Sequence, residues 1–376
     1  MSKKNITVLQ VLPALESGGV EKGTLEVAKF LVEKGHRSIV ISKGGRLLKL
    51  LIKSGSEHLK LDIGKKSLLT LKYIPVLIKF IKINNIDIIH VRSRFPAWVI
   101  YFTLKFISKK IRPVLITTVH GPYSINYYSS IMTKGDLVIA ISEMIKKYIL
   151  DNYKVQRKRL YLNFRGIDAR NYNHNQTVSK KWRSSWYKEY PNTKNKILIT
   201  LPARITRWKG QEDFLSLILS LKNDFPEIHG LIVGDTQKGK INFLRSLREK
   251  VKSNNLSDNI TFTGHREDIK EIMLISKIVF SLSNQPEAFG RVSLEALSLG
   301  IPVIAYSHGG VEEQLKNILP SGLVTKNNKQ LLYEKTKIFL TKPPTPKKNN
   351  YFLLKNMLEK TLKIYFIGLN NIKDRH

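Results

Sequence analysis

Cysteine is absent from the 376-residue chain, so the sequence excludes disulfide bonds, thiolate metal sites and catalysis by a thiol. Long apolar runs are absent too. The most apolar stretch, Ala97 to Ile107, contains Lys105 and is far shorter than the roughly 20 residues that a membrane-spanning helix needs. We interpret it as a helix buried between a sheet and its neighbours. The first residues lack the apolar stretch and cleavage site of a secretory signal, which predicts a cytoplasmic protein.

Acidic side chains are scarce. The chain has 29 aspartates and glutamates against 64 lysines and arginines, which gives a formal net charge of +35. Such a charge attracts nucleic acid, anionic membranes and phosphorylated substrates alike. Lysine is spread evenly along the chain, and asparagine and isoleucine are also abundant, so a compositional bias of the genome is an alternative explanation.

Strand-like and helix-like segments alternate along the chain, which is typical of α/β proteins with parallel, doubly wound sheets. In the first half, strands are expected at 5–12, 37–42, 86–90, 114–119 and 137–141, and helices at 18–34, 68–83, 97–108 and 143–153. The second half repeats the pattern, with strands at 197–201, 229–233, 260–262, 278–281 and 302–305, and helices at 211–224, 243–253 and 289–299.

A chain of this length is expected to form two such domains. A polar and aromatic stretch at 168–196 is predicted to connect them. We therefore expect an N-terminal Rossmann-like domain at 1–175 and a second one at 176–350. A final helix at 351–376 is expected to pack back on the first domain.

Two glutamates frame the most informative stretch, Pro286 to Ala305, whose order is loop, helix, glycine and strand. Glu287 lies in the loop before the helix and Glu295 lies inside the helix. The amides at the start of the helix can then face an anion. Carboxylates suit the vicinal hydroxyls of a sugar and a ribose, while the amides suit a diphosphate. The residues at the helix start are Phe289, Gly290, Arg291 and Val292.

A second group of basic residues lies at 202–211, between an expected strand and an expected helix. Arg204 can present a planar fork to phosphate oxygens and Lys209 a point charge, both near the start of the helix. Positive charge at these positions could stabilise a diphosphate as it leaves.

Several motifs together resemble the Glu-x7-Glu signature of retaining glycosyltransferase family 4. They are the spacing of Glu287 and Glu295, the Phe-Gly after the first glutamate, the Gly-Ile-Pro-Val at 300–303 and the segment 309–313. The resemblance covers residues 5–325 and implies a GT-B fold, in which two Rossmann-like domains face each other across a cleft. It implies that the domain at 1–175 binds the acceptor and the domain at 176–350 binds the nucleotide sugar. It also implies retention of the anomeric configuration, with Glu287 at the donor sugar and Glu295 at the ribose.

The same resemblance implies further donor-site residues. Gly18 and Gly19 match the family's Gly-Gly loop after the first strand, and His120 matches a histidine at the end of a strand. Gly234 and Arg266 stand where the family's base-binding loops lie. The Arg and Lys-Gly pair at 204–210 is also similar to the family's. The expected catalytic residues are His120, Arg204, Lys209 and Glu287.

Two features of the first half have open interpretations. Arg92 and Arg94 follow a strand that ends at His90, where they could meet an anionic acceptor or cap the structure. The segment Arg165 to Asp168 resembles the place where the family's first domain passes into the second, although asparagine is commoner there than Arg165.

The expected donor is a UDP-, GDP- or ADP-sugar, and the sequence does not specify the base. No Asp-x-Asp pair stands where a donor site would need it, so we expect transfer without a metal ion or another cofactor. No carboxylate is an obvious nucleophile. We therefore expect attack on the front face of the sugar, with the leaving phosphate taking the acceptor's proton.

A glycan or lipid-linked acceptor of the cell envelope, as in lipopolysaccharide synthesis, is the expected second substrate. The net charge and the lysines of the expected helix 68–83 favour a protein held peripherally on the inner face of the cytoplasmic membrane. These lysines are Lys72, Lys79 and Lys82. The alternative is a helix that packs on the core and hydrates its lysines.

Three other functions stay open. The first is a GT-B protein without transfer activity that acts as a membrane-associated partner. The second is a basic nucleic-acid-binding protein, although the chain lacks aromatic residues interleaved with a basic stripe, so we expect no nucleic acid partner. The third is a sugar nucleotide 2-epimerase of the same fold.

Overall fold

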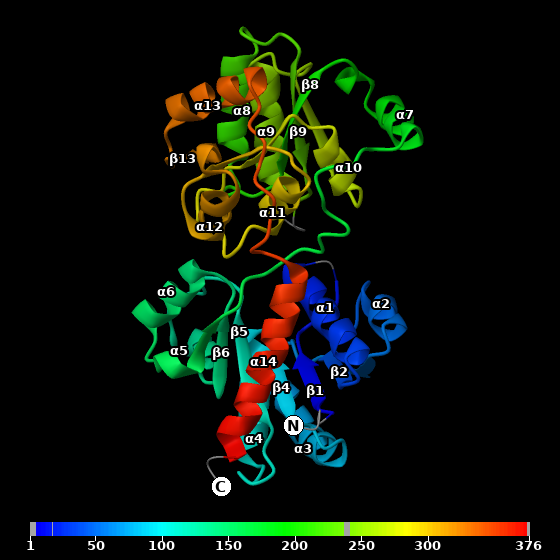
Figure 1. The fold of residues 1–376 in the computed structure, drawn as a ribbon, viewed down its shortest axis with the longest axis vertical. Coiled ribbons are helices and arrows are strands. Elements are labelled where there is room, and N and C mark those ends of the chain that lie inside the picture. The colour runs from blue at the N-terminus through cyan, green and yellow to red at the C-terminus, as the bar shows by residue number, and fades with distance from the viewer. Residues whose placement is uncertain (1–4, 17, 237–240, 374–376) are drawn as a thin grey trace. The chain divides into compact units, whose positions relative to one another are not determined.

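A computed structural model describes residues 5–16, 18–236 and 241–373. The chain divides into two compact units, each built on one parallel sheet (Figure 1). The first unit comprises the chain up to Arg165 together with Lys355 onwards, and the second comprises Gly166 to Leu354. This division assigns residues 166–175 to the second unit, whereas the sequence had suggested a boundary at 175.

The sheet of the first unit has, among the described residues, seven parallel strands in the order β3-β2-β1-β4-β5-β6-β7. The order reverses between β1 and β4, which makes this the switch point at which open α/β sheets bind ligands. β4 and β5 are buried along their whole length, as the apolar runs predict. The strands are β1 (Thr7–Val11), β2 (Arg37–Ser42), β3 (Glu57–Lys60), β4 (Ile88–Val91), β5 (Val114–Val119), β6 (Leu137–Ala140) and β7 (Leu160–Leu162).

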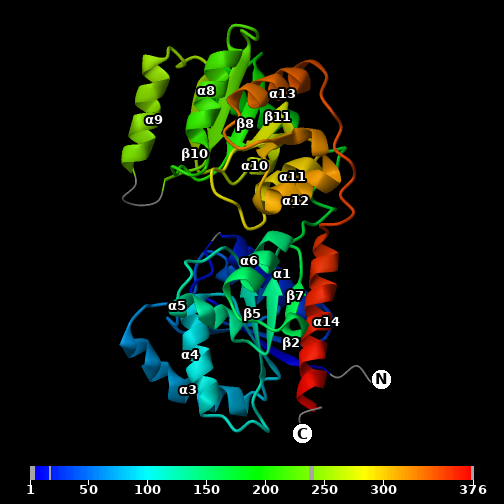
Figure 2. The same cartoon turned by 90° about the vertical axis from the view of Figure 1, so that its left-hand side faces the viewer.

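Helices cover both faces of this sheet (Figures 1 and 2). Apolar residues of α1 and α2 pack on β1 and β2, and the buried cluster there consists of Leu12, Leu15, Ala28, Val40 and Leu51. The helices are α1 (Gly19–Glu33), α2 (Leu48–Lys53), α3 (Tyr73–Ile83), α4 (Arg94–Lys105), α5 (Tyr127–Ser130) and α6 (Glu143–Asn152), with short 3-10 turns η1 (Leu68–Lys72), η2 (Ile131–Thr133) and η3 (Arg157–Arg159).

The C-terminal helix α14 (Leu354–Lys373) returns to the first unit, as the sequence predicted. Its Tyr365 hydroxyl lies 2.7 Å from His90 Nδ1 at the end of β4. The side-chain amide of Asn163 donates to the carbonyl of Met357, at 3.1 Å, and to the hydroxyl of Thr361, at 2.9 Å. Buried polar groups therefore fix the position of the helix on the sheet.

The second unit repeats the plan with the order β10-β9-β8-β11-β12-β13, all parallel within the described residues. Its switch point lies between β8 and β11. The strands are β8 (Ile197–Pro202), β9 (Ile228–Val233), β10 (Ile260–Gly264), β11 (Ile278–Ser281), β12 (Val303–Tyr306) and β13 (Leu323–Val324). The helices are α7 (Lys180–Glu189), α8 (Gln211–Leu221), α9 (Ile241–Ser253), α10 (Ile269–Leu274), α11 (Arg291–Ser298), α12 (Gly309–Ile318) and α13 (Lys329–Thr341), with the turns η4 (Pro191–Thr193) and η5 (Pro320–Gly322).

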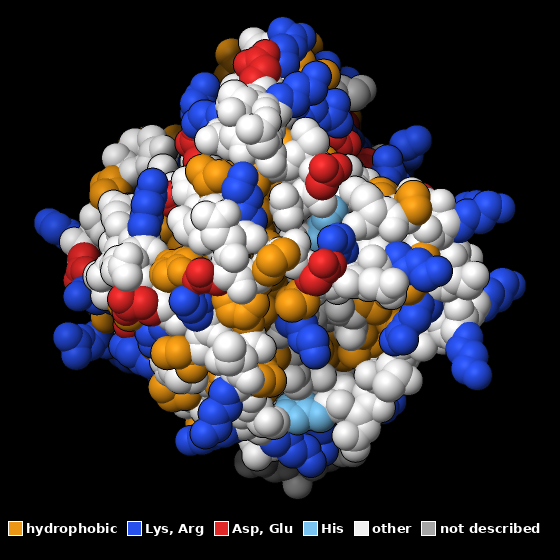
Figure 3. All heavy atoms as spheres, turned by 90° about the horizontal axis from the view of Figure 1, so that it is seen from above, with side chains coloured by type: hydrophobic (Ala, Val, Ile, Leu, Met, Phe, Trp, Pro, Cys, Tyr) orange, Lys and Arg blue, Asp and Glu red, His pale blue; other side chains and the backbone are white. Residues whose placement is uncertain are grey.

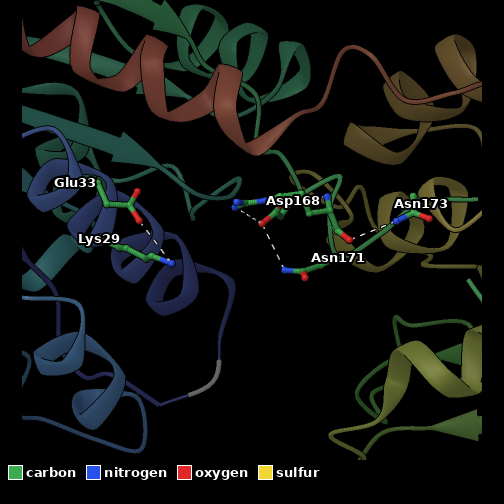
Figure 4. A network of polar contacts seen from close by, with 6 residues as sticks. Lys29, Glu33, Asp168, Asn171 and Asn173 are labelled. Atoms are coloured by element: carbon green, nitrogen blue, oxygen red, sulfur yellow. Dashed lines mark hydrogen bonds and ion pairs between the residues drawn. The ribbon is translucent and has the colours of Figure 1, made fainter. Parts of the chain in front are cut away.

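The stretch 168–196, expected to connect the domains, lies entirely within the second unit. It contains α7, whose Trp186 is 2% exposed and packs against Leu198 and Ile272. The residues before α7 form a polar network in which Asp168 binds Arg170 and Asn171 (Figure 4). Ile167 pairs with Leu353 in a parallel bridge, so two distant segments of the second unit run side by side.

Two expectations for the first unit are corrected. The helix expected at 68–83 is divided into η1, which buries only Thr70, and α3, which packs inward through Leu77 and Ile81. The helix expected from Ala97 is α4, which is buried on one face only, because Trp98 and Phe102 lie on its half-buried side. No helix in the described part of the chain is both long and apolar enough to cross a bilayer.

Replacing Tyr365 by phenylalanine tests how α14 is held. The change leaves the packing almost intact but removes the hydroxyl that bonds His90, so we expect a loss of about 1–3 kcal/mol in the free energy of unfolding. Urea titration measures it. Tyr351→Phe is the control, because Tyr351 is 66% exposed and its change should cost almost nothing. Equal effects of the two changes would contradict this account.

Candidate functional site

The switch point of the second unit brings two loops together. β8 and β11 are neighbouring parallel strands, so both end at the same edge of the sheet. The loop after β8 leads to Lys209, and the loop after β11 leads to Glu287. The backbone amide of Asn284 donates to the backbone carbonyl of Trp208 at 2.7 Å, which links the two loops directly.

Glycine allows these loops to come close. Gly210 has φ +78°, and a Cβ there would lie 2.0 Å from the carbonyl oxygen of Leu282. Gly309 has φ +69°, and a Cβ there would lie 2.6 Å from the carbonyl oxygen of Glu287. Larger residues would therefore push the start of α8 and the start of α12 away from the loop after β11.

Lys209 and Glu287 form an ion pair, with 2.6 Å between Nζ and Oε1. The two side chains are 13% and 20% exposed, so the pair is largely shielded from water. Ser283 donates to the same carboxylate oxygen at 2.5 Å, and the ammonium lies 4.2 Å from the centre of the Trp208 ring. These contacts fix the direction of both charges.

The loop that carries Glu287 is held from α12. The amide of Gly310 donates to the carbonyl of Glu287 at 2.8 Å, and His308 Nε2 lies 2.7 Å from the carbonyl of Ser283. The fully buried Gln314 donates from Nε2 to the carbonyls of Phe289, at 2.5 Å, and Gly290, at 3.1 Å. The loop is therefore preorganised by hydrogen bonds.

The helix start expected to bind an anion lies beside this pair. Gly290 caps α11 with φ +80°, and the first amides of a helix have no partner within the helix. A polar cavity of about 40 Å³ is lined by Lys209, Glu287, Gly290, Val292 and residues of β8 and β11. It exceeds the roughly 15 Å³ that one water needs. The structure thus brings the ammonium, the carboxylate and the helix start to one cavity.

Two other residues of the Glu-x7-Glu stretch, Glu295 and Phe289, are more deeply buried. Glu295 has a side chain only 7% exposed, and its Oε1 lies 3.2 Å from Nε of Arg291 one turn earlier. Phe289 is 5% exposed and packs edge-on against Phe352, with ring centres 5.8 Å apart. Phe289 therefore anchors the helix start, while Arg291 and Glu295 form a second ion pair on α11.

Three expected donor residues do not line the cavity. Arg204 is exposed, and its guanidinium has no hydrogen bond or ion pair among the described residues, while its carbonyl accepts from Gln211. The amide of Gly234 donates to the carbonyl of Gly264 at 2.9 Å. Arg266 lies in a separate cluster described next.

Arg266 holds α7 on the sheet. Its guanidinium binds both carboxylate oxygens of Asp268 at 2.8 Å and Oε1 of Glu189 at 2.7 Å, and lies 5.7 Å from the Trp186 ring centre. The hydrogen bond with Asp268 is the main cause that raises the pKa of Arg266. The N–H groups of Arg266 already form hydrogen bonds within the second unit. We therefore do not include Arg266 in the proposed nucleotide-sugar site.

In the first unit, the expected residues lie at the carboxyl edge of the sheet. Gly18 and Gly19 are exposed where α1 begins after β1. His120 directly follows β5. Its Nδ1 lies 3.2 Å from Nη2 of Arg165, and its Nε2 is buried without a hydrogen-bond partner in the described part of the chain.

The contact with Arg165 determines the tautomer of His120. A guanidinium can only donate, so Nδ1 accepts and Nε2 carries the ring proton. Burial, and then the charges of Arg165 and Arg92, hold the pKa of His120 well below its usual value, so the ring is neutral. Gly23 makes room for this arginine, because a Cβ there would lie 2.3 Å from Arg165 Nη1. His120 therefore has a buried Nε2–H group that finds no hydrogen-bond acceptor among the described residues.

Arg92 and Arg94, for which two interpretations were open, both contact other residues of the first unit, as does His90. Arg92 is 3% exposed and donates twice to Gln10 Oε1, at 3.0 and 2.7 Å. His90 Nε2 lies 2.6 Å from the hydroxyl of Thr118. Arg94 stacks on Tyr123 at 4.7 Å. Arg92 and His90 therefore belong to one buried polar network, and Arg94 contacts a separate group of tyrosines.

Sequence reasoning missed Ser283, His308 and Gln314, which hold the loop of Glu287. Only the Gly-Gly at 309–310 signalled that α12 approaches this loop. It also missed the role of Arg165 at His120. No cluster of three histidine, aspartate or glutamate side chains suited to a metal ion occurs among the described residues.

Solved structures identify the fold. A glycosyltransferase from Rickettsia africae ESF-5 superimposes with a TM-score of 0.86 and 33% identity, covering 98% of this chain and 99% of that one. Anabaena Alr3699/HepE, solved with UDP and glucose, superimposes with a TM-score of 0.75 at 19% identity, covering 99% of both chains. Two units with parallel sheets and these neighbours define the GT-B fold that the sequence predicted.

Family comparisons agree with this fold. Residues 17–171 match the model "Glycosyltransferase Family 4", and residues 183–352 match "Glycosyl transferases group 1". The chain therefore belongs to the group 1/family 4 glycosyltransferases. Among curated relatives, N-acetyl-alpha-D-glucosaminyl L-malate synthase of Bacillus anthracis is 24% identical over 62% of this chain. The matches span 60% of that relative and 63% and 62% of two others.

The buried histidines predict that stability falls in acid. His90 and His120 have pKa values well below 6.5, chiefly because of burial. Below about pH 6.5 the unfolded chain binds protons that the native state excludes, so the free energy of unfolding should decrease as the pH is lowered. Urea titrations at pH 7.5, 6.5 and 5.5 measure it.

His120→Gln should make the free energy of unfolding less dependent on pH, because the variant lacks one of the two rings that stay unprotonated in the native state. Replacing the exposed His265 by glutamine is the control and should leave the slope unchanged. A stability that stays constant or rises on acidification would show that the two rings are accessible to protons in the native state.

Proposed function

We propose that the protein transfers a sugar from a nucleoside diphosphate sugar to an acceptor hydroxyl, with retention of configuration. Membership of the family supports glycosyl transfer. The observation that carries the proposal is the cavity at the switch point, where the Lys209–Glu287 pair meets the start of α11. A cation and free helix amides suit a diphosphate, and a fixed carboxylate suits sugar hydroxyls.

In this proposal the second unit holds the donor. Lys209 and the amides at Gly290 to Val292 bind the diphosphate, Glu287 accepts hydrogen bonds from the sugar, and Glu295 accepts them from the ribose. Arg204, exposed and without a partner among the described residues, is available to a phosphate. His120 of the first unit is a proposed donor to a sugar or acceptor oxygen, since its Nε2 proton has no protein acceptor in the described chain.

The proposed chemistry needs no covalent intermediate. The bond between the anomeric carbon and the phosphate oxygen breaks, and the acceptor oxygen forms its bond on the same face of the sugar. The acceptor's proton passes to the departing phosphate oxygen. Lys209 and the helix start stabilise the negative charge that develops on the diphosphate, which a metal ion would otherwise stabilise.

The proposed acceptor is an envelope glycan or a lipid-linked glycan, reached from an anionic membrane surface. The net charge of +35 supports attraction to such a surface. Named relatives act on different acceptors, so the argument rests on this chain alone. We also propose that neither a metal ion nor another cofactor takes part.

Two alternatives have less support. On the face drawn in Figure 3, lysine and arginine side chains are scattered among acidic and neutral ones, rather than gathered in the stripe that tracks a nucleic acid backbone. A partner protein without activity would have no need for the ordered Lys209–Glu287 pair. Loss of that order is what an inactive relative would be expected to show.

The first experiment is calorimetry with UDP, GDP, ADP and their common sugar conjugates. We expect one nucleotide to bind selectively. Lys209→Ala should weaken it by about 2 kcal/mol, or roughly thirtyfold in Kd, because a hydrogen bond to a charged group is lost. Glu295→Ala should also weaken it.

Lys196→Ala is the matched control. Lys196 pairs with Glu227 at 2.7 Å on the same unit, almost the distance of the Lys209–Glu287 pair, but away from the cavity. It should leave nucleotide affinity unchanged. If the wild-type protein binds no nucleotide, the inactive partner is favoured. If both lysine variants lose the same nucleotide affinity, the cavity is not the nucleotide site.

Chelation and trapping test the proposed chemistry. Once the donor is known, EDTA should leave the rate of sugar transfer unchanged, because protein charges stabilise the leaving diphosphate. Mass spectrometry of the enzyme with a slow fluorinated donor should show no glycosyl adduct. A strong loss of rate with EDTA, or an adduct on a carboxylate, would contradict this mechanism.

A further inference from the structure

The first unit contains an apolar groove that the proposed donor chemistry does not use. It lies between η1, α4 and α5, encloses about 540 Å³ and is lined almost entirely by carbon. Its lining includes Leu68 and Leu71 of η1, Trp98 and Phe102 of α4, and Tyr127 of α5.

The rim of this groove exposes large apolar side chains. Leu68 is 85% exposed, Leu69 74% and Tyr127 74%. Hydrophobic residues are exposed singly on most proteins, but a group of them beside an apolar groove marks an interaction surface. The turn η1 presents its leucines outward because α3, which follows it, packs inward through Leu77 and Ile81.

Lysines surround the groove. Lys66 Nζ lies 5.7 Å from the centre of the Tyr128 ring, and Lys134 Nζ lies 5.4 Å from Tyr127 and 5.9 Å from Trp98. Residues 64–135 contain twelve lysines and arginines and a single acidic residue, Asp87. The Asp87 carboxylate accepts from the amide of Thr7 in the sheet. The groove therefore combines a hydrocarbon lining with a cationic rim.

This combination selects the occupant. A sugar needs polar side chains along the groove, and Ser67 is the one hydroxyl amino acid besides the tyrosines in its lining. A nucleobase needs a free aromatic face, but Trp98 is stacked on Phe102 at 5.5 Å and packs against Tyr127 at 5.2 Å. A hydrocarbon chain that ends in an anionic headgroup satisfies both the lining and the rim.

We propose that this groove binds a hydrocarbon chain of an anionic lipid in a bilayer, with Lys66 and Lys134 at the lipid phosphate. The inference deepens the proposed attraction to a membrane and rests on it, because it names the site and the lipid class. Within the segment 68–83 it places the contact on η1 rather than α3, and it adds α4 and α5. Lipid binding does not require an active donor site, so the two can fail separately.

The test is flotation of the full chain with vesicles of phosphatidylcholine, with or without phosphatidylglycerol. We expect binding only to the anionic vesicles. Leu68→Gln should weaken binding about tenfold through the loss of buried apolar area, and Lys134→Gln about fivefold. The matched controls are Leu50→Gln, whose side chain is 56% exposed on the same unit, and Lys29→Gln, whose lysine pairs with Glu33 (Figure 4). Both should bind like wild type.

Tryptophan fluorescence gives a second readout. Vesicles that carry brominated acyl chains should quench the emission of Trp98, and Trp98→Phe should abolish this quenching while the protein still floats with the vesicles. The outcomes that overturn the proposal are equal effects of the groove and control variants, quenching that persists in Trp98→Phe, or binding of an oligonucleotide in preference to the vesicles. Nucleotide calorimetry on the same Leu68→Gln protein should match wild type, which separates a failed lipid site from a failed donor site.

Discussion

The ion pair between Lys209 and Glu287 joins two loops that are 78 residues apart in the chain. A charge shielded from water is stable only when its partner is fixed, so the position of each loop depends on the other. Gly210 and Gly309 let the backbones approach, and Gln314 holds the carbonyls behind Glu287. The polar cavity depends on this arrangement, because both loops and the start of α11 line it.

Much of the fold could be predicted because central parallel strands are continuous apolar runs. The expected bounds at 37–42, 114–119 and 278–281 agree with β2, β5 and β11. Elements without a clear apolar pattern were missed. β3, with the sequence Glu-His-Leu-Lys, has no apolar run, and α7 is rich in lysine and serine. Trp186 becomes a core residue only through long-range contacts with Leu198 and Ile272, which no local pattern records.

The site could be predicted in part, for a similar reason. Motif spacing located Lys209 and Glu287, but charge pattern alone could not separate a ligand-binding arginine from a structural one. Arg266 is held by Glu189, which is 77 residues away, and this pairing exists only in the folded unit. The aromatic residues of α4 looked like core in the sequence. In the structure they cover one side of a groove, because η1 does not close over them.

The return of α14 to the first unit affects how the chain folds during synthesis. His90 and its partner Tyr365 are 275 residues apart, so the whole second unit is made between them. At roughly 5–20 residues per second, the ribosome leaves the sheet of the first unit without this helix for tens of seconds. The second unit is continuous in sequence and can fold as soon as it emerges. The first unit is therefore begun first and completed last, and until then it exposes the apolar surface that α14 covers.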